Sequence, residues 1–260
     1  MEILTNNHKH DKMQPDARGT ADFFSVTAMK PAQKSQNRVN IFLNDDFAFS
    51  LDLAQVVDFG LKIGKILNLE EIENLKSASE YGKLYQSTLE WILTRPHSEK
   101  ETHDNLKQKQ YKRSLENKKR LNNREKLKQN PELKSKQKDF KIHTKLLPEI
   151  SDENIEKVFA TLKSRGYLDD EKFVKFYLEN RFVKKGISQK RLKMELLKKG
   201  INEKTITKFF SETPRDESEE IKKVIQKKRQ KYDDEKLIQY LVRQGFDFEL
   251  SRNLVRGTDW

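Results

Sequence analysis

The sequence predicts a mainly helical protein in which three tandem three-helix repeats form an elongated, curved body behind a small module of a β-hairpin and helices. Of its 260 residues, 36% are charged and 34% hydrophobic, which favours thin helical layers over one deep core. Nine Gly and six Pro are too few for an all-β fold with many turns. One helix pattern also recurs three times, at offsets of 90 and 45 residues, and the first offset is twice the second because the first unit contains a basic insertion.

The N-terminal part changes period along its length. Residues 1–20 are polar and aperiodic, so we expect a disordered tail. Large apolar residues then alternate with polar ones in two runs, separated by the turn residues Asn44 to Asp46. The runs contain Val39, Ile41, Leu43, Phe47, Phe49 and Leu51, and Phe24, Val26 and Ala28 fit a third strand. With helical patterns from Leu53 and over 69–78, interrupted by Gly60 and Gly64, residues 21–78 are predicted to form a small α+β module.

Three segments of the chain share one pattern. Each opens with a residue suited to cap a helix and carries a Leu eight positions later. A helix-ending position follows four residues on, and a large apolar residue comes next. The four positions are Ser98, Leu106, Gln110 and Tyr111; Ser188, Leu196, Gly200 and Ile201; and Asp233, Leu241, Gly245 and Phe246. Because Gln110 lacks the freedom of Gly, the first helix is expected to end differently.

Apolar stripes at helical spacing flank each shared segment and indicate three helices per repeat. The predicted repeats are 79–168, 169–212 and 213–260, and the first contains a basic insertion at about 112–148. Residues 111–148 hold 13 Lys and Arg against 4 Asp and Glu, within a chain of net charge +12. A helix could continue to Gln129 and stop at Pro131, as part of a mobile basic arm that either seeks a polyanion or is simply solvated.

Several function classes lack the residues they need. The chain has no Cys, no run of 18 apolar residues and no apolar signal core, so we expect a cytoplasmic protein without disulfides or membrane contact. Gly60 to Lys65 matches a phosphate-binding loop only loosely, because Ile66 replaces the hydroxyl residue. His97 and His103 do not share a helix face. We therefore predict no catalytic residues, no metal and no cofactor.

The segment from Gly166 resembles the central signature of the RecX family. The residues that carry this likeness are Gly166, Tyr167, Leu168, Asp169, Asp170, Phe173, Arg181, Gly186, Glu195, Leu196, Lys199, Gly200 and Ile201. The run from Arg95 to Leu106 resembles the opening of the family's first repeat, and residues 39–69 resemble the N-terminal extension of long Gram-positive members. The basic insertion has no counterpart, and Gln110 stands where the family often has Gly.

The resemblance implies a monomeric, non-enzymatic regulator of homologous recombination and DNA repair. Its partners would be the recombinase RecA and the RecA–single-stranded DNA filament, whose growth, ATP hydrolysis and strand exchange it would mostly inhibit. From the residues themselves, a direct DNA-binding helical repeat protein is the alternative.

A dense cationic set in the second repeat is the candidate contact surface for either partner. It comprises Arg181, Lys184, Lys185, Lys190, Arg191, Lys193, Lys198 and Lys199. Cations in the first turn of a helix oppose its dipole, so local stability does not account for Lys190, Arg191 and Lys193. An external anionic partner would account for them, and a solvated helix face is the competing interpretation.

Overall fold

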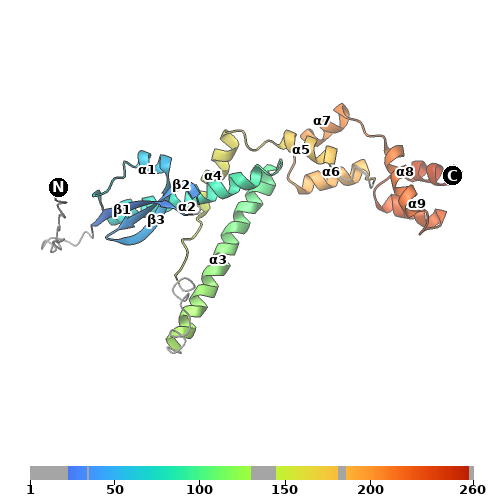
Figure 1. Ribbon diagram of the computed structural model, residues 1–260. Coiled ribbons are helices and arrows are strands. Elements are labelled where there is room, and N and C mark those ends of the chain that lie inside the picture. Colours follow the sequence, from blue (N-terminus) through green and yellow to red (C-terminus); the bar gives the residue numbers. More distant parts are fainter. Residues whose placement is uncertain (1–22, 34, 130–144, 181–185, 258–260) are drawn as a thin grey trace, which may run out of the picture. The chain divides into compact units, whose positions relative to one another are not determined.

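The computed structural model describes residues 23–33, 35–129, 145–180 and 186–257. The chain divides into two compact units, Met1–Gly82 and Lys83–Trp260. Strands occur in the first unit and helices make up the second, so the mainly helical fold behind a small strand module is confirmed (Figure 1). The predicted tail, residues 1–20, lies outside the described residues.

A four-stranded antiparallel sheet forms the first unit, in the order β3-β2-β1-β4. Its strands are β1 (Phe24–Ala32), β2 (Ser35–Leu43), β3 (Asp46–Asp52) and β4 (Ile66–Leu67). The tight turn between β2 and β3 places Asn44 and Asp45 at φ 47° and 69°. Asn and Asp tolerate this left-handed conformation, which matches the twist of a two-residue hairpin. The predicted hairpin and third strand are therefore confirmed.

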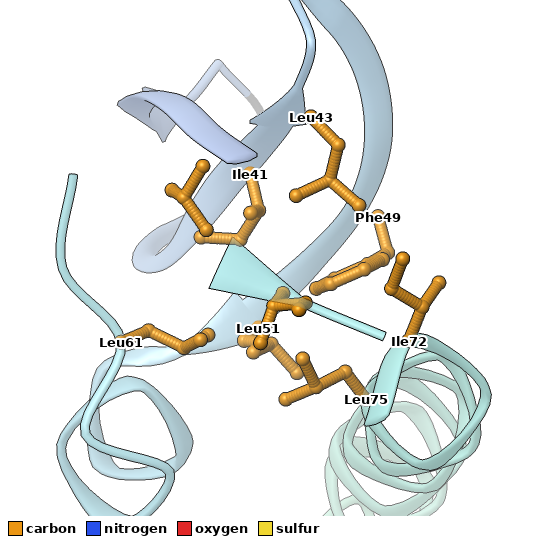
Figure 2. Close-up of a cluster of buried hydrophobic side chains, with 9 residues drawn as sticks. Ile41, Leu43, Phe49, Leu51, Leu61, Ile72 and Leu75 are labelled. Carbon is orange, nitrogen blue, oxygen red and sulfur yellow. The ribbon is translucent and has the colours of Figure 1, made fainter. Parts of the chain in front are cut away.

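The core of this unit lies between the sheet and two helices, α1 (Leu53–Asp58) and α2 (Leu69–Ile92). Figure 2 shows Ile72 and Leu75 of α2 directed toward Leu51 and Phe49 of β3. Phe47 does not join them and is 47% exposed, because the register of β2 and β3 shifts between Ile41 and Phe42. Strict alternation predicts Phe47 on the buried face. The register shift leaves one extra residue in β3 that has no partner in β2, and this residue turns Phe47 outward.

α2 is one helix of 24 residues, where the sequence suggests a short helix ending at Ala78. The expected module boundary at residue 78 therefore falls inside α2. Gly82 lies within the helix, and a Cβ there would come within 3.1 Å of the side chains of Arg38 and Gln55. The glycine thus admits the Arg38 side chain, which bonds the carbonyl oxygens of Ser50 and Ser79.

α3 (Glu99–Gln129) extends as far as predicted, and Gln110 does not interrupt it (Figure 1). A returning segment, residues 145–150, runs along its outer half. Gln110, Arg113 and Asn117 donate hydrogen bonds of 2.8–2.9 Å to the carbonyl oxygens of Ile150, Pro148 and Leu147. Arg120 does the same to Lys145. The described part of the predicted mobile arm is therefore a helix braced on one face, while residues 130–144 lie outside the description.

The remaining helices complete the three units of the pattern. They are α4 (Asp152–Ser164), α5 (Asp170–Asn180), α6 (Gln189–Lys198), α7 (Glu203–Glu212), α8 (Glu217–Lys228), α9 (Asp234–Arg243) and α10 (Phe248–Arg256). α5, α6 and α7 enclose one buried apolar cluster, and α8, α9 and α10 enclose another. The aromatic stripe at Phe173 and Phe210 belongs to the first of these clusters, so it is core and not a stacking platform for bases.

We predict that Leu51→Ala lowers the free energy of unfolding of the first unit by about 2–5 kcal/mol. The Leu51 side chain is fully buried, so its loss leaves a cavity that the sheet and α2 cannot close. Urea unfolding followed by circular dichroism measures the change. Val57→Ala is the control, because Val57 is 77% exposed. Equal losses in the two variants would contradict the core described above.

Candidate partner-binding surface on the helical repeats

Consecutive repeats are joined where the middle helix of one unit meets the middle helix of the next. The Ser98 hydroxyl accepts a bond from the Glu101 amide of α3 and donates one of 2.8 Å to the Lys199 carbonyl, which caps α6. Ser188 repeats this between α6 and α9, with a 2.6 Å bond to the Gln244 carbonyl. We call these contacts the first and the second junction. At each, one hydroxyl satisfies a free amide and a free carbonyl of two helix ends.

The same two features support both junctions. Gly200 and Gly245 have φ of +83° and +92°, and a Cβ on either would lie within 3 Å of the preceding unit, at Lys100 or at Ser188. Carboxylates at the start of the next unit's first helix accept hydrogen bonds from the free backbone amides beside the bridging serines. Asp170 accepts from the Glu99 amide at 2.9 Å, and Glu217 accepts from the Gln189 amide at 3.0 Å. Asp170 therefore caps its neighbour, while Asp169 caps its own helix.

The first junction holds a charged cluster centred on Glu101. Its carboxylate bonds His97, Arg95 and Lys199, and the His97 ring lies 3.5 Å from that of Trp91. Burial alone would raise the pKa of the Glu101 carboxyl, but hydrogen bonds from His97, Lys199 and Arg95 outweigh it and hold the pKa far below its usual range. The cluster thus locks the first two units together through a carboxylate that stays ionised.

The structure places five of the eight predicted contact residues, all on α6 or its C-terminal cap. Arg181, Lys184 and Lys185 lie outside the described residues. Three others have internal partners: Arg191 contacts Gln244 and Glu195, Lys193 pairs with Glu203, and Lys199 pairs with Glu101. Lys190 and Lys198 are exposed, and no ion pair joins either to the described part of the chain.

The junctions also account for cations in the first turn of α6. The C-terminus of α9, where helix carbonyl oxygens gather, lies against this turn through the bond from Ser188 to Gln244. The stem of Lys190 lies over Gly245, just as Lys100 lies over Gly200. The sequence argument that favours an external anionic partner for these cations is therefore weakened, because a neighbouring helix end supplies negative potential.

A second surface on α6 escapes the charge-based search. Lys190, Met194, Leu197 and Lys198 fall at positions i, i+4, i+7 and i+8, and so share one face, which we call the α6 face. Met194 is 53% exposed and Leu197 43% exposed. The sequence signal that could have revealed this face is a pair of large apolar residues between two lysines at helical spacing. Such an apolar centre with a cationic rim is typical of protein contact surfaces.

No helix in the described ranges is long and apolar enough to cross a membrane. Within these same ranges, no group of three His, Cys, Asp or Glu side chains is arranged to hold a metal ion. The fold and its surfaces define a tandem three-helix-repeat protein with an exposed apolar and cationic face on its middle repeat and a strand module at the N-terminal end of the chain.

Comparison with known proteins shows similarity to regulatory proteins of one family. The model for the regulatory protein RecX N-terminal domain matches residues 25–68, and that for the second RecX three-helix domain matches residues 169–208. A regulatory protein RecX from Bacillus licheniformis is 26% identical over 90% of this chain and 78% of its own. One from Clostridium perfringens is 22% identical over 89% and 94%. The chain is therefore similar to RecX regulatory proteins along about nine-tenths of its length, and these relatives are named as regulatory proteins.

A solved structure supports the fold independently. The crystal structure of a regulatory protein RecX aligns over 90% of this chain and 100% of its own, with a TM-score of 0.58 at 19% identity. At that identity the likeness concerns the fold, namely tandem helical units behind the N-terminal module.

We predict that Gly245→Ala destabilises the protein more than Gly166→Ala does. Both glycines have positive φ, so each alanine costs about 1–2 kcal/mol in backbone strain. Only at Gly245 does the new Cβ also meet the neighbouring unit, 2.8 Å from the Ser188 hydroxyl, whereas nothing lies within 4 Å at Gly166. Urea unfolding gives the difference, and amide exchange at Gln244 and Arg191 reports the second junction. Equal costs would mean that the junction is not tightly packed.

Acid should weaken the first junction through Glu101. Because its pKa is lowered in the folded protein, the carboxylate stabilises the fold above the unfolded value of about 4.3, and this contribution is lost as pH falls. Glu101→Gln should therefore lose less stability than the parent between about pH 5 and about pH 3, by urea unfolding. Glu235→Gln, an exposed change of the same kind on α9, is the matched control. A Glu101 variant as acid-sensitive as the parent would contradict this.

Proposed function

We propose that this protein regulates the recombinase RecA by binding RecA–single-stranded DNA filaments and limiting their growth, ATP hydrolysis and strand exchange. Similarity to RecX regulatory proteins supports this function. The α6 face is the observation on which the proposal rests, since it presents apolar surface on a repeat unit whose neighbours are held in register by the junctions. We also propose that it acts as a monomer in the cytoplasm.

The chemistry of the α6 face favours a protein contact over a nucleic-acid contact. Met194 is unbranched and adaptable, and Leu197 lies one helical turn away, so together they can fill a shallow apolar pocket on a partner. Lys190 and Lys198 lie at the two ends of this stripe and can pair with partner carboxylates at the rim. Buried apolar contacts at the centre of an interface carry most of its binding energy.

The cationic set remains part of the proposed contact surface around this centre. It comprises Arg181, Lys184, Lys185, Lys190, Arg191, Lys193, Lys198 and Lys199. Lys193 and Lys199 already form ion pairs within the protein, so each would have to leave its own carboxylate partner to bind one on another protein. These residues therefore contribute more to long-range attraction than to direct contact.

Direct binding to DNA is a second candidate function, favoured by the outer half of α3. The returning segment covers one face of this helix, while five cations stay exposed: Lys112, Lys118, Lys119, Arg124 and Lys126. A rigid helix that displays cations along its length can follow a phosphate backbone, and its affinity for DNA would fall steeply with salt. RecA regulation and DNA binding could act together in a filament.

We predict that replacing Met194 and Leu197 by Glu abolishes inhibition of RecA without unfolding the protein. Both side chains are more than a third exposed, so the change removes the apolar centre of the proposed contact but leaves the cores intact. The measurement is single-stranded-DNA-dependent ATP hydrolysis by RecA, titrated with the regulator below RecA's own concentration. The parent protein should lower the rate at these amounts, as expected of a protein that acts on filaments.

The matched control replaces Tyr111 and Leu121 by Glu on α3. These residues are 63% and 44% exposed, so the control adds the same two charges at apolar positions elsewhere. It should inhibit like the parent. Unchanged inhibition by the α6 variant would exclude this face as the contact. A parent protein that leaves the ATPase rate unchanged yet binds bare DNA in a salt-sensitive way would replace RecA regulation with the second candidate function.

A further inference from the structure

A cavity of about 710 Å³ opens at the second junction, between α6, α8 and α9. Its apolar wall includes Ile187, Val224 and Phe246. Its charged lining consists of Arg191, Lys227, Lys228 and Lys231, and no carboxylate is among the described residues that line it. Its volume lies within the range of small-molecule sites. Four cations around one hollow without a lining anion produce a local positive potential.

At the first junction, the side chains equivalent to Arg191 and Gln244 carry opposite charges and neutralise each other. Glu101 and Arg191 occupy the same place, three residues after the bridging serine, and Lys199 and Gln244 both cap the helix that docks there. At the first junction Glu101 and Lys199 form an ion pair across the units. At the second, Arg191 meets the neutral Gln244, and its carboxylate partner is Glu195 of its own helix at 3.6 Å.

This exchange removes the inter-unit neutralisation while the backbone contacts stay the same. Ser188 still bridges to the Gln244 carbonyl, so the second junction does not need extra cations for its architecture. Lys227 and Lys228 lie in the last turn of α8, where the helix dipole favours cations. That effect favours cations at these two positions, and the C-terminus of α9 favours one at Arg191, but neither effect requires these side chains and Lys231 to line the same hollow.

From this geometry we infer that the cavity at the second junction binds phosphate groups of a nucleotide or a nucleic-acid strand. Four cations line one hollow, and together they match a ligand with several adjacent negative charges. Arg191 can bond two phosphate oxygens with its planar guanidinium, and lysines supply further charge. This site is separate from the α6 face and needs no RecA, so it extends the proposed function.

The aromatic residue in the cavity favours recognition of the backbone over the base. The Tyr240 ring already stacks against Tyr232 at 5.6 Å, and the Lys228 ammonium lies 5.4 Å from its centroid. Little of the ring is left for a stacked base. The ligand would therefore be held by its phosphates, with its sugar against the apolar wall, and binding would be insensitive to base sequence.

The test compares two variants that each remove two positive charges. Lys228→Gln with Lys231→Gln changes the cavity, whereas Lys204→Gln with Lys222→Gln changes α7 and a part of α8 outside the lining. The full-length proteins are titrated into a fluorescein-labelled oligothymidylate at several salt concentrations. The slope of log affinity against log salt should fall by about 1.4 in the cavity variant, because each phosphate neutralised on a single strand contributes about 0.7. The control should keep the parent slope.

Competition identifies the source of the phosphate. Displacement of the oligothymidylate by unlabelled oligonucleotide, but not by ATP, assigns the site to a nucleic-acid strand. Calorimetric binding of ATP that the cavity variant loses and the control keeps assigns it to a free nucleotide. Equal losses in the two variants, binding of neither phosphate ligand, or tighter binding of a poly-glutamate peptide would overturn the inference. Since RecA is absent, these results do not depend on the proposed function.

Discussion

The end-to-end contact of helices from neighbouring repeats is the interaction on which the rest of the helical unit depends. A helix leaves free amides at its start and free carbonyls at its end, with opposite partial charges. Ser98 and Ser188 each join such a start to such an end with one hydroxyl that accepts and donates. The left-handed glycine and the carboxylate from the next unit both help to bring these two ends together.

Because the backbone of each junction is fixed in this way, the side chains around it can vary. The first junction uses that freedom to bury a charged cluster in which Glu101 is held by three cationic or imidazole partners. The second has an arginine and a neutral amide in the equivalent places. The same backbone contact therefore occurs in two electrostatic settings. At the first junction opposite charges pair and hold the units together, and at the second the positive charge is available to an anion.

Local patterns in the sequence predict much of this architecture. Apolar periodicity and capping residues locate α3 to α10, and alternation with Asn44 and Asp45 locates the hairpin. Features that depend on distant residues are missed. The bulge that exposes Phe47 is a property of the β2–β3 pairing, and the close approach of the Arg38 side chain to Gly82 of α2 joins residues that are far apart in the sequence. Likewise, Ser98 reads as a local cap, although its second partner is 101 residues away.

Asp233 shows why the choice of cap matters. It occupies the position of Ser98 and Ser188, and it accepts from the Lys236 amide of α9 in the same way. A carboxylate, however, has no proton to donate, so it cannot also bond the carbonyl that caps another helix. It would instead repel that carbonyl oxygen. Asp234 and Glu235 add negative charge to the same turn, which satisfies the helix dipole without a neighbouring helix end. Serine can therefore bridge two helix ends, whereas aspartate caps only its own helix, a difference of one hydroxyl proton.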